Sequence, residues 1–285
     1  MFISIFKTTF KNLFRSVTFW LTLSVLIIVL VNTAMSGYHG RYMPEYDEMI
    51  WDTDSRYVLT YNVAHQWISN AATLLMRYML PILATVTAVI TLNRDYGDGF
   101  FEIEKASGMK PSQYILGRLS SLLSINYIIA TIAYFLTFHL YVYTRNGIEG
   151  MAFWDYLTDT TVRLFRISFF RVLPCILFFL CFTYLLGAIF KSRIVAAIGS
   201  MGYTIAMYVL NFFIVSKDGI FLDYLCPIPS KLELYYFCYD TDNFEQFIDN
   251  MNVTLTDALI CLIVLIGVST LYGLYSYILI RKRTV

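Results

Sequence analysis

The sequence is short of charge and of the motifs that carry chemistry. Only 14% of its residues are charged, against roughly a quarter in soluble domains, and the net charge is +1. A nearly neutral chain has no general attraction for nucleic acid. The CxxC, HExxH and cysteine–histidine patterns that hold metal ions do not occur. The pattern GxxxxGK[ST] is also missing, so the chain has no P-loop to bind the phosphates of ATP.

What the chain has instead is long apolar runs. Hydrophobic residues make up 58% of it, and the mean hydropathy is +0.61. Runs of about 18 or more apolar residues with few charges are typical of transmembrane helices. We expect six spans, at about 17–35, 70–92, 119–143, 169–190, 194–215 and 255–280. Residues 1–285 are therefore predicted to form one all-α integral membrane domain.

Lysine and arginine mark one side of these spans. Counting the cations near span ends places both termini in the cytoplasm and residues 217–254 outside the cell membrane. The connection between spans three and four fits least well, because Arg145, Arg163, Arg166 and Arg171 are assigned to the expected outer side. The cations of the inner side are Lys7, Lys11, Arg15, Arg94, Lys105, Lys110, Arg118, Lys191, Arg193, Arg281, Lys282 and Arg283.

No carboxylate lies at the centre of an expected span. This argues against a proton- or sodium-coupled transporter and against a membrane aspartyl protease. Arg77 is a cation inside span two, which makes it a candidate functional residue. The alternatives are that Arg77 reaches the outer interface or pairs with an acid of an outer loop. Cys226 and Cys238 share one polar loop and could form a disulfide outside the cell, or remain two free thiols.

Residues 1–16 have the pattern of an amphipathic helix. At 100° per residue, Phe6, Phe10 and Phe14 fall on one arc with Phe2, Ile3 and Leu13. A basic edge runs beside this arc and consists of Lys7, Lys11 and Arg15. Such a helix lies in the headgroup plane, with its cations towards anionic membrane lipid. The alternative is a positively charged flank of the first span that happens to be helical.

A charged, glycine-punctuated segment, "NRDYGDGFFEIEKASGMKPSQYILGR", separates spans two and three. Asp98 or Gly99 suits the cap of a short helix that begins at Phe100, and Gly108 suits its end in a left-handed conformation. Pro111 suits the first turn of the next helix. The short helix would expose apolar side chains among charges, namely Phe100, Phe101, Ile103, Glu102 and Lys105. It suits docking to a soluble partner, or an interfacial turn on lipid headgroups.

Together these features resemble the permease subunit of an ABC-2 type ABC transporter. Residues 99–103, 108–112 and 115–118 match the family's loop, its proline-containing turn and the start of its third span. The departures are Phe100, where a small hydroxyl residue is common, and Arg118, where lysine is usual.

The resemblance implies an ATP-driven exporter whose coupling helix, between helices two and three, docks on a cytoplasmic ABC ATPase. ATP and Mg would be bound by that partner, so this chain would need no cofactor and would not be an enzyme. A second permease copy, or a related permease, would complete the pathway. The coupling residues would be Gly99, Phe100, Phe101, Glu102, Ile103, Lys105, Gly108 and Pro111. The alternatives are a non-transporting sensor, immunity or regulatory subunit, and a membrane-embedded enzyme.

Overall fold

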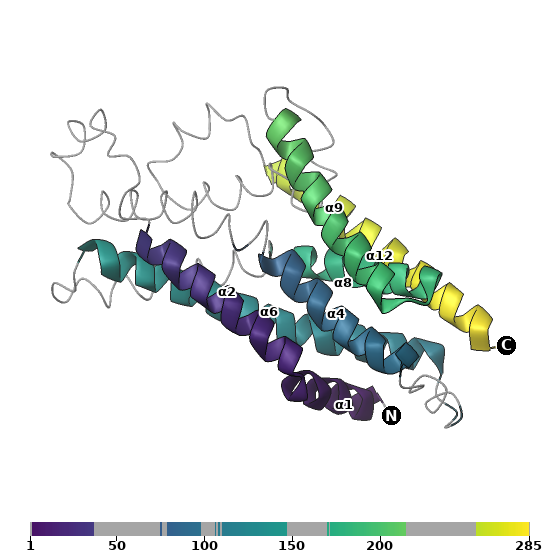
Figure 1. The fold of residues 1–285 in the computed structure, drawn as a ribbon. Coiled ribbons are helices and arrows are strands. Elements are labelled where there is room, and N and C mark those ends of the chain that lie inside the picture. The colour runs from purple at the N-terminus through teal and green to yellow at the C-terminus, as the bar shows by residue number, and fades with distance from the viewer. Residues whose placement is uncertain are drawn as a thin grey trace.

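A computed structural model describes residues 2–36, 75, 79–97, 106, 108, 110–146, 170, 172–214 and 255–284. This part of the chain is all-helical and contains no strand (Figure 1). The α-class predicted from the sequence is therefore confirmed for these residues. The helices are α1 (Phe2–Arg15), α2 (Val17–Ser36), α4 (Leu80–Gly97), α6 (Pro111–Asn146), α8 (Leu173–Phe190), α9 (Arg193–Ile214) and α12 (Leu255–Thr284).

Several of these helices can cross a membrane. By length and apolar composition, three described segments qualify: Ser112–Thr137, Leu173–Phe190 and Thr256–Lys282. The count rises to four if α1 and α2 form one broken span. The apolar stretches of α4 and α9 that the structure describes, Leu80–Leu92 and Arg193–Ala206, are shorter. Each of the six predicted spans overlaps one helix, but the six-span arrangement itself stays a prediction.

The chain turns sharply between α1 and α2. The two helices are bent by 67° at Ser16. The Ser16 hydroxyl oxygen accepts a hydrogen bond from the Phe19 backbone N–H at 3.4 Å, as an N-cap serine does at the start of a helix. The indole N–H of Trp20 donates to the Phe14 carbonyl oxygen at 2.8 Å, which satisfies one of the last carbonyls of α1. Residues 2–15 therefore form a helix separate from the first predicted span.

Pro81 and Pro174 lie near the starts of α4 and α8. Each is the second residue of its α-helix, in the first turn, where a missing N–H costs no intrahelical hydrogen bond. Wider π-type turns lie just before them, at Met79 and at Val172.

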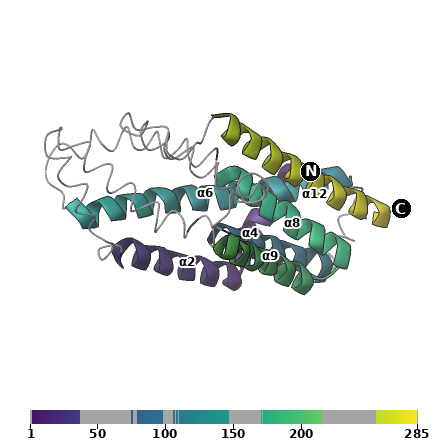
Figure 2. The same cartoon turned by 90° about the horizontal axis from the view of Figure 1, so that it is seen from above.

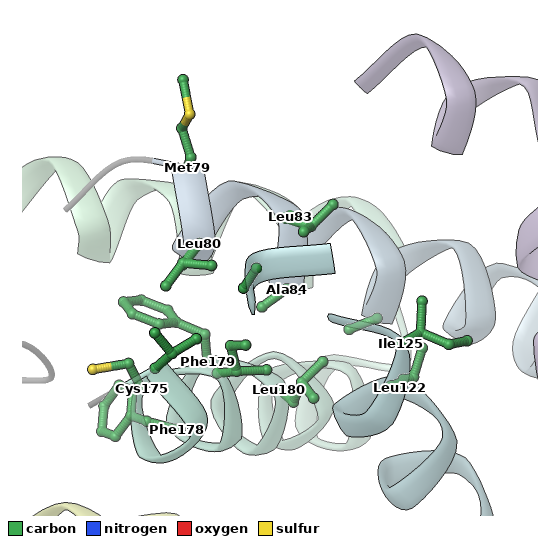
Figure 3. Close-up of a cluster of buried hydrophobic side chains, with 14 of the residues drawn as sticks. Met79, Leu80, Leu83, Ala84, Leu122, Ile125, Cys175, Phe178, Phe179 and Leu180 are labelled. Atoms are coloured by element: carbon green, nitrogen blue, oxygen red, sulfur yellow. The ribbon is translucent and has the colours of Figure 1, made fainter. Parts of the chain in front are cut away.

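Helix α8 lies at the centre of the fold and packs against α4, α6, α9 and α12. Figure 3 shows Phe179 and Leu180 of α8 facing Leu80 and Ala84 of α4, with two side chains of α6 alongside. Gly187 permits a close approach of α4, because a Cβ built there would lie 2.7 Å from Leu92 Cδ1. Large apolar side chains on the outside of the bundle stay exposed, as lipid-facing residues do.

Both chain ends lie towards the same end of the bundle (Figures 1 and 2). We call this end the base. At the base α4 ends, α6 begins, and a small apolar cluster joins α6 to the ends of α8 and α12. Its buried members are Tyr114, Ile115, Ala188 and Ile280.

Candidate functional site at the base of the bundle

Arg118 is a fully buried arginine at the base, with a relative exposure of 0%. Its Nη2 donates to Asp95 Oδ1 of α4 at 2.8 Å, and its Nη1 donates to Thr9 Oγ1 of α1 at 2.6 Å. The guanidinium carbon lies 5.5 Å from the centre of the Tyr114 ring, within the range of a cation–π contact. We call Thr9, Asp95, Tyr114 and Arg118 the Arg118 cluster. The cluster joins three helices that are distant in sequence.

The hydroxyl of Thr9 is oriented by a second hydrogen bond. It donates to the Ile5 carbonyl oxygen of its own helix at 2.9 Å, so its oxygen lone pairs remain to accept from Arg118. A buried charge costs several kcal/mol to dehydrate unless partners offset that loss. Here a carboxylate, a hydroxyl and an aromatic face all contact one guanidinium. The cluster therefore fixes how α1, α4 and α6 lie relative to one another.

Helix α1 packs closely on the first turns of α6. A Cβ built on Gly117 would lie 3.0 Å from Ile5 Cγ2, so a larger residue would require Ile5 to shift. The Ser121 hydroxyl donates to the Phe6 carbonyl oxygen at 3.3 Å, one turn further along α6. Together with Arg118, these contacts follow one face of α6.

The apolar face of α1 differs from the predicted one in the position of Leu13. Leu13 was grouped with the lipid-facing phenylalanines, but it is buried towards the bundle with Ile5 and Thr9. Phe10 and Phe14 are 38% and 39% exposed. Rings stack along the helix, with centroids 6.4 Å apart for Phe6–Phe10 and 4.8 Å apart for Phe10–Phe14. Lys7, Lys11 and Arg15 are exposed.

The predicted coupling segment is described only at its edges. Gly99, Phe100, Phe101, Glu102, Ile103 and Lys105 lie outside the described residues. Gly108 has φ of +77°, in the left-handed region expected of it, and α6 begins at Pro111. Asp95 and Arg118 stand on either side of this segment, 23 residues apart, and their ion pair holds its two ends together.

The remaining candidate residues fall in two groups. Arg77, Cys226 and Cys238 lie outside the described residues. Three cysteines of the described helices are buried: Cys175, Cys181 and Cys261. Among the residues that the structure describes, no group of three His, Cys, Asp or Glu side chains could hold a metal ion.

Two further polar contacts join helices inside the bundle. The Asn126 amide of α6 donates to Thr87 Oγ1 of α4 at 2.8 Å, and the hydroxyls of Thr183 and Ser200 lie 2.8 Å apart between α8 and α9. Helix α9 carries small residues that include Gly199 and Ser200. Ser200 is buried, and a Cβ on Gly199 would lie 2.7 Å from Leu186 Cδ1. These two members make an intrachain contact with α8.

Comparison with known protein families and with curated proteins finds no match for this chain. The class that the fold defines is a helical protein with several apolar helices able to span a membrane. Its distinctive site is the Arg118 cluster, where an amphipathic helix meets the two helices that flank a charged segment.

Proposed function

We propose that the chain is the transmembrane permease subunit of an ATP-driven ABC-2 type exporter. The observation that carries this proposal is the Arg118 cluster, which connects α1, α4 and α6 through one buried guanidinium. A segment that is displaced by a soluble ATPase must be attached rigidly to the membrane helices. The ion pair of Asp95 and Arg118 provides such an attachment at both ends of residues 98–109.

In this proposal the segment around Gly99–Lys105 docks on a cytoplasmic ABC ATPase, which binds ATP and Mg. ATP binding closes the ATPase pair and displaces the docked segment. This displacement moves α4 and α6 together, because the Asp95–Arg118 ion pair joins them. The hydrogen bond between Arg118 and Thr9 then moves α1, which lies on the membrane surface in this proposal. A second permease copy, or a related permease, forms the other half of the pathway.

The chemistry of the buried residues favours an external source of energy. Among the described side chains, the buried acid is Asp95, and it is paired with Arg118 at the base. A carboxylate held in this way suits a structural attachment better than the binding and release of protons along a transport path.

Co-purification tests the proposal directly. The full chain is expressed with the ATPase encoded by a neighbouring gene and isolated in detergent. We expect the ATPase to remain bound, and the double change Phe101→Asp with Glu102→Arg to release it while membrane insertion is retained. Lys282→Glu, an exposed charge reversal on α12, serves as the matched control and should leave binding intact.

Two results would contradict the proposal. Unchanged ATPase binding by the double variant would show that the docking segment is wrongly assigned. Labelling of Lys105 or Lys110 by an impermeant reagent outside intact cells would invert the orientation. A chain that binds no ATPase would instead favour a sensor, immunity or regulatory subunit.

A further inference from the structure

A cavity of about 190 Å³ lies between α2, α4 and α6, away from the base. Its wall includes Leu26 and Leu30 of α2, Met79 just before α4, Leu83 of α4, and Ala133 of α6. Met79, just before α4, points away from Phe179 and Leu180 in Figure 3, whereas Leu80, which faces α8, also lines the cavity. The cavity therefore lies at the edge of the central core, and no member of the Arg118 cluster lines it.

The cavity wall is almost wholly hydrocarbon. Its one polar lining side chain is Thr137, whose hydroxyl donates to the Ala133 carbonyl oxygen of its own helix. Water needs two to four polar partners to occupy a protein cavity, and this wall provides no such set. An apolar cavity of roughly 150 Å³ in another protein stays dry and takes up benzene. The cavity wall therefore suits an apolar ligand.

The cavity reaches the side of the bundle. Ile27, Ile132 and Leu136 line it and are 43%, 60% and 47% exposed, whereas Leu26, Leu30 and Leu83 are 8% exposed or less. The opening thus lies between α2 and α6, on a surface of apolar side chains. If these helices span a membrane, the hydrocarbon of the bilayer lies at the opening.

We propose that this cavity binds the acyl chain of a bilayer phospholipid. A helix of a second copy, about 10 Å across, is too wide to enter a space of this volume. A flexible hydrocarbon chain matches the wall in chemistry and can enter from the side at Ile27 and Leu136. The site requires a membrane but does not require transport, so it can hold whether or not the chain is a permease.

Photolabelling tests the site. The full chain is reconstituted in phosphatidylcholine vesicles that contain a trace of phosphatidylcholine with a diazirine on one acyl chain. After irradiation, mass spectrometry locates the adducts. We expect adducts on Leu30 and Leu83, which are 5% and 3% exposed. Ile263 of α12 is 71% exposed and reports contact with bulk lipid.

Filling the cavity should remove the buried adducts selectively. Ala133→Phe is expected to lower labelling of Leu30 and Leu83 about tenfold, the loss expected when two methylene groups no longer fit. Labelling of Ile263 should not change. Ile128→Phe is the matched control, because Ile128 is 52% exposed on the same helix and does not line the cavity.

A second variant guards against a folding defect. Leu136→Trp closes the opening from its exposed rim and should give the same selective loss. Absence of adducts on Leu30 and Leu83 in the unmodified protein would overturn the proposal, since it would show that side chains or another segment fill the space. Persistence of these adducts in both Ala133→Phe and Leu136→Trp would overturn it as well.

Discussion

The two ends of the α2–α4–α6 group are built in opposite ways. At the base, charges and hydrogen bonds join α1, α4 and α6, and a glycine brings α1 and α6 into contact. Away from the base, the side chains of α2, α4 and α6 that line a cavity of about 190 Å³ are apolar except for Thr137. Helices α4 and α6 are therefore fixed at one end and loosely packed at the other.

The difference follows from the physics of helix packing in lipid. Apolar helices gain little by leaving hydrocarbon for one another, so close packing and polar contacts decide where they associate. A buried ion pair has one good geometry, whereas leucine and isoleucine tolerate many. The base sets the register of the three helices, and the other end is free to accept an apolar guest. Variants at each end can test this contrast.

Removing the guanidinium should give the largest effect. In Arg118→Met the Asp95 carboxylate stays buried without its ion-pair partner, so we expect the free energy of unfolding to fall by about 3–5 kcal/mol. Unfolding in mixed micelles, followed by tryptophan fluorescence as the denaturing detergent is raised, measures this change.

The double variant Arg118→Met with Asp95→Leu controls for the lost side chain. It removes both charges, and it should recover at least half of the lost stability. Arg193→Met, at an exposed cation of α9, should change stability by no more than about 0.5 kcal/mol. If Arg118→Met behaves like Arg193→Met, the cluster does not fix the base.

Enlarging Gly117 should have the next largest effect. A Cβ at this position already lies within 3.0 Å of Ile5 Cγ2, so the longer side chain of Gly117→Leu must displace α1 from α6. We expect a loss of about 2–3 kcal/mol and faster proteolysis of the first residues. In Gly202→Leu the new side chain has room, since no described atom lies within 4 Å of a Cβ at Gly202. Equal losses in both variants would contradict a specific α1–α6 contact.

The Thr9 hydroxyl should contribute less. Thr9→Val keeps the shape of the side chain but removes the acceptor of the Arg118 hydrogen bond, so we expect a loss of about 1.5 kcal/mol. Thr8→Val is the matched control one residue earlier, where the hydroxyl bonds only to the Ser4 carbonyl oxygen among the contacts described. A Thr9→Val variant as stable as Thr8→Val would mean that Arg118 does not depend on α1.

The helices themselves were predictable because they are marked in the sequence by long apolar runs or by patterns of neighbouring residues. The apolar runs predicted every described helix after the first, and the spacing of Phe6, Phe10 and Phe14 predicted α1. Pro111 and Gly108 have the positions that their backbone chemistry favours. Such features depend on a few neighbouring residues, so a single sequence contains them.

The Arg118 cluster was not predicted, because its members pair across 23 and 109 residues. Arg118 was counted only among the cations of the inner side and at the start of span three, and no partner was predicted for it. The sequence did contain a signal for this ion pair, because Asp95 follows the second apolar run and Arg118 precedes the third. The start of α6 at Pro111 was predicted, but sequence alone could not show that α4 extends to Gly97, nor that Thr9 and Asp95 both meet Arg118.

The smallest effect should come from filling the cavity, and it should not show the loss expected for Gly117→Leu. Ala133→Phe adds a large side chain where the structure has empty apolar space, so we expect stability to stay within about 1 kcal/mol or to rise. The same change in Ala84→Phe, at a fully buried position between α4 and α8, should be strongly destabilising because no space remains there. Detergent unfolding of both variants compares them directly. If Ala133→Phe lost as much stability as Ala84→Phe, the space between α2, α4 and α6 would be closed in the folded protein. The contrast between a fixed base and an open far end would then fail.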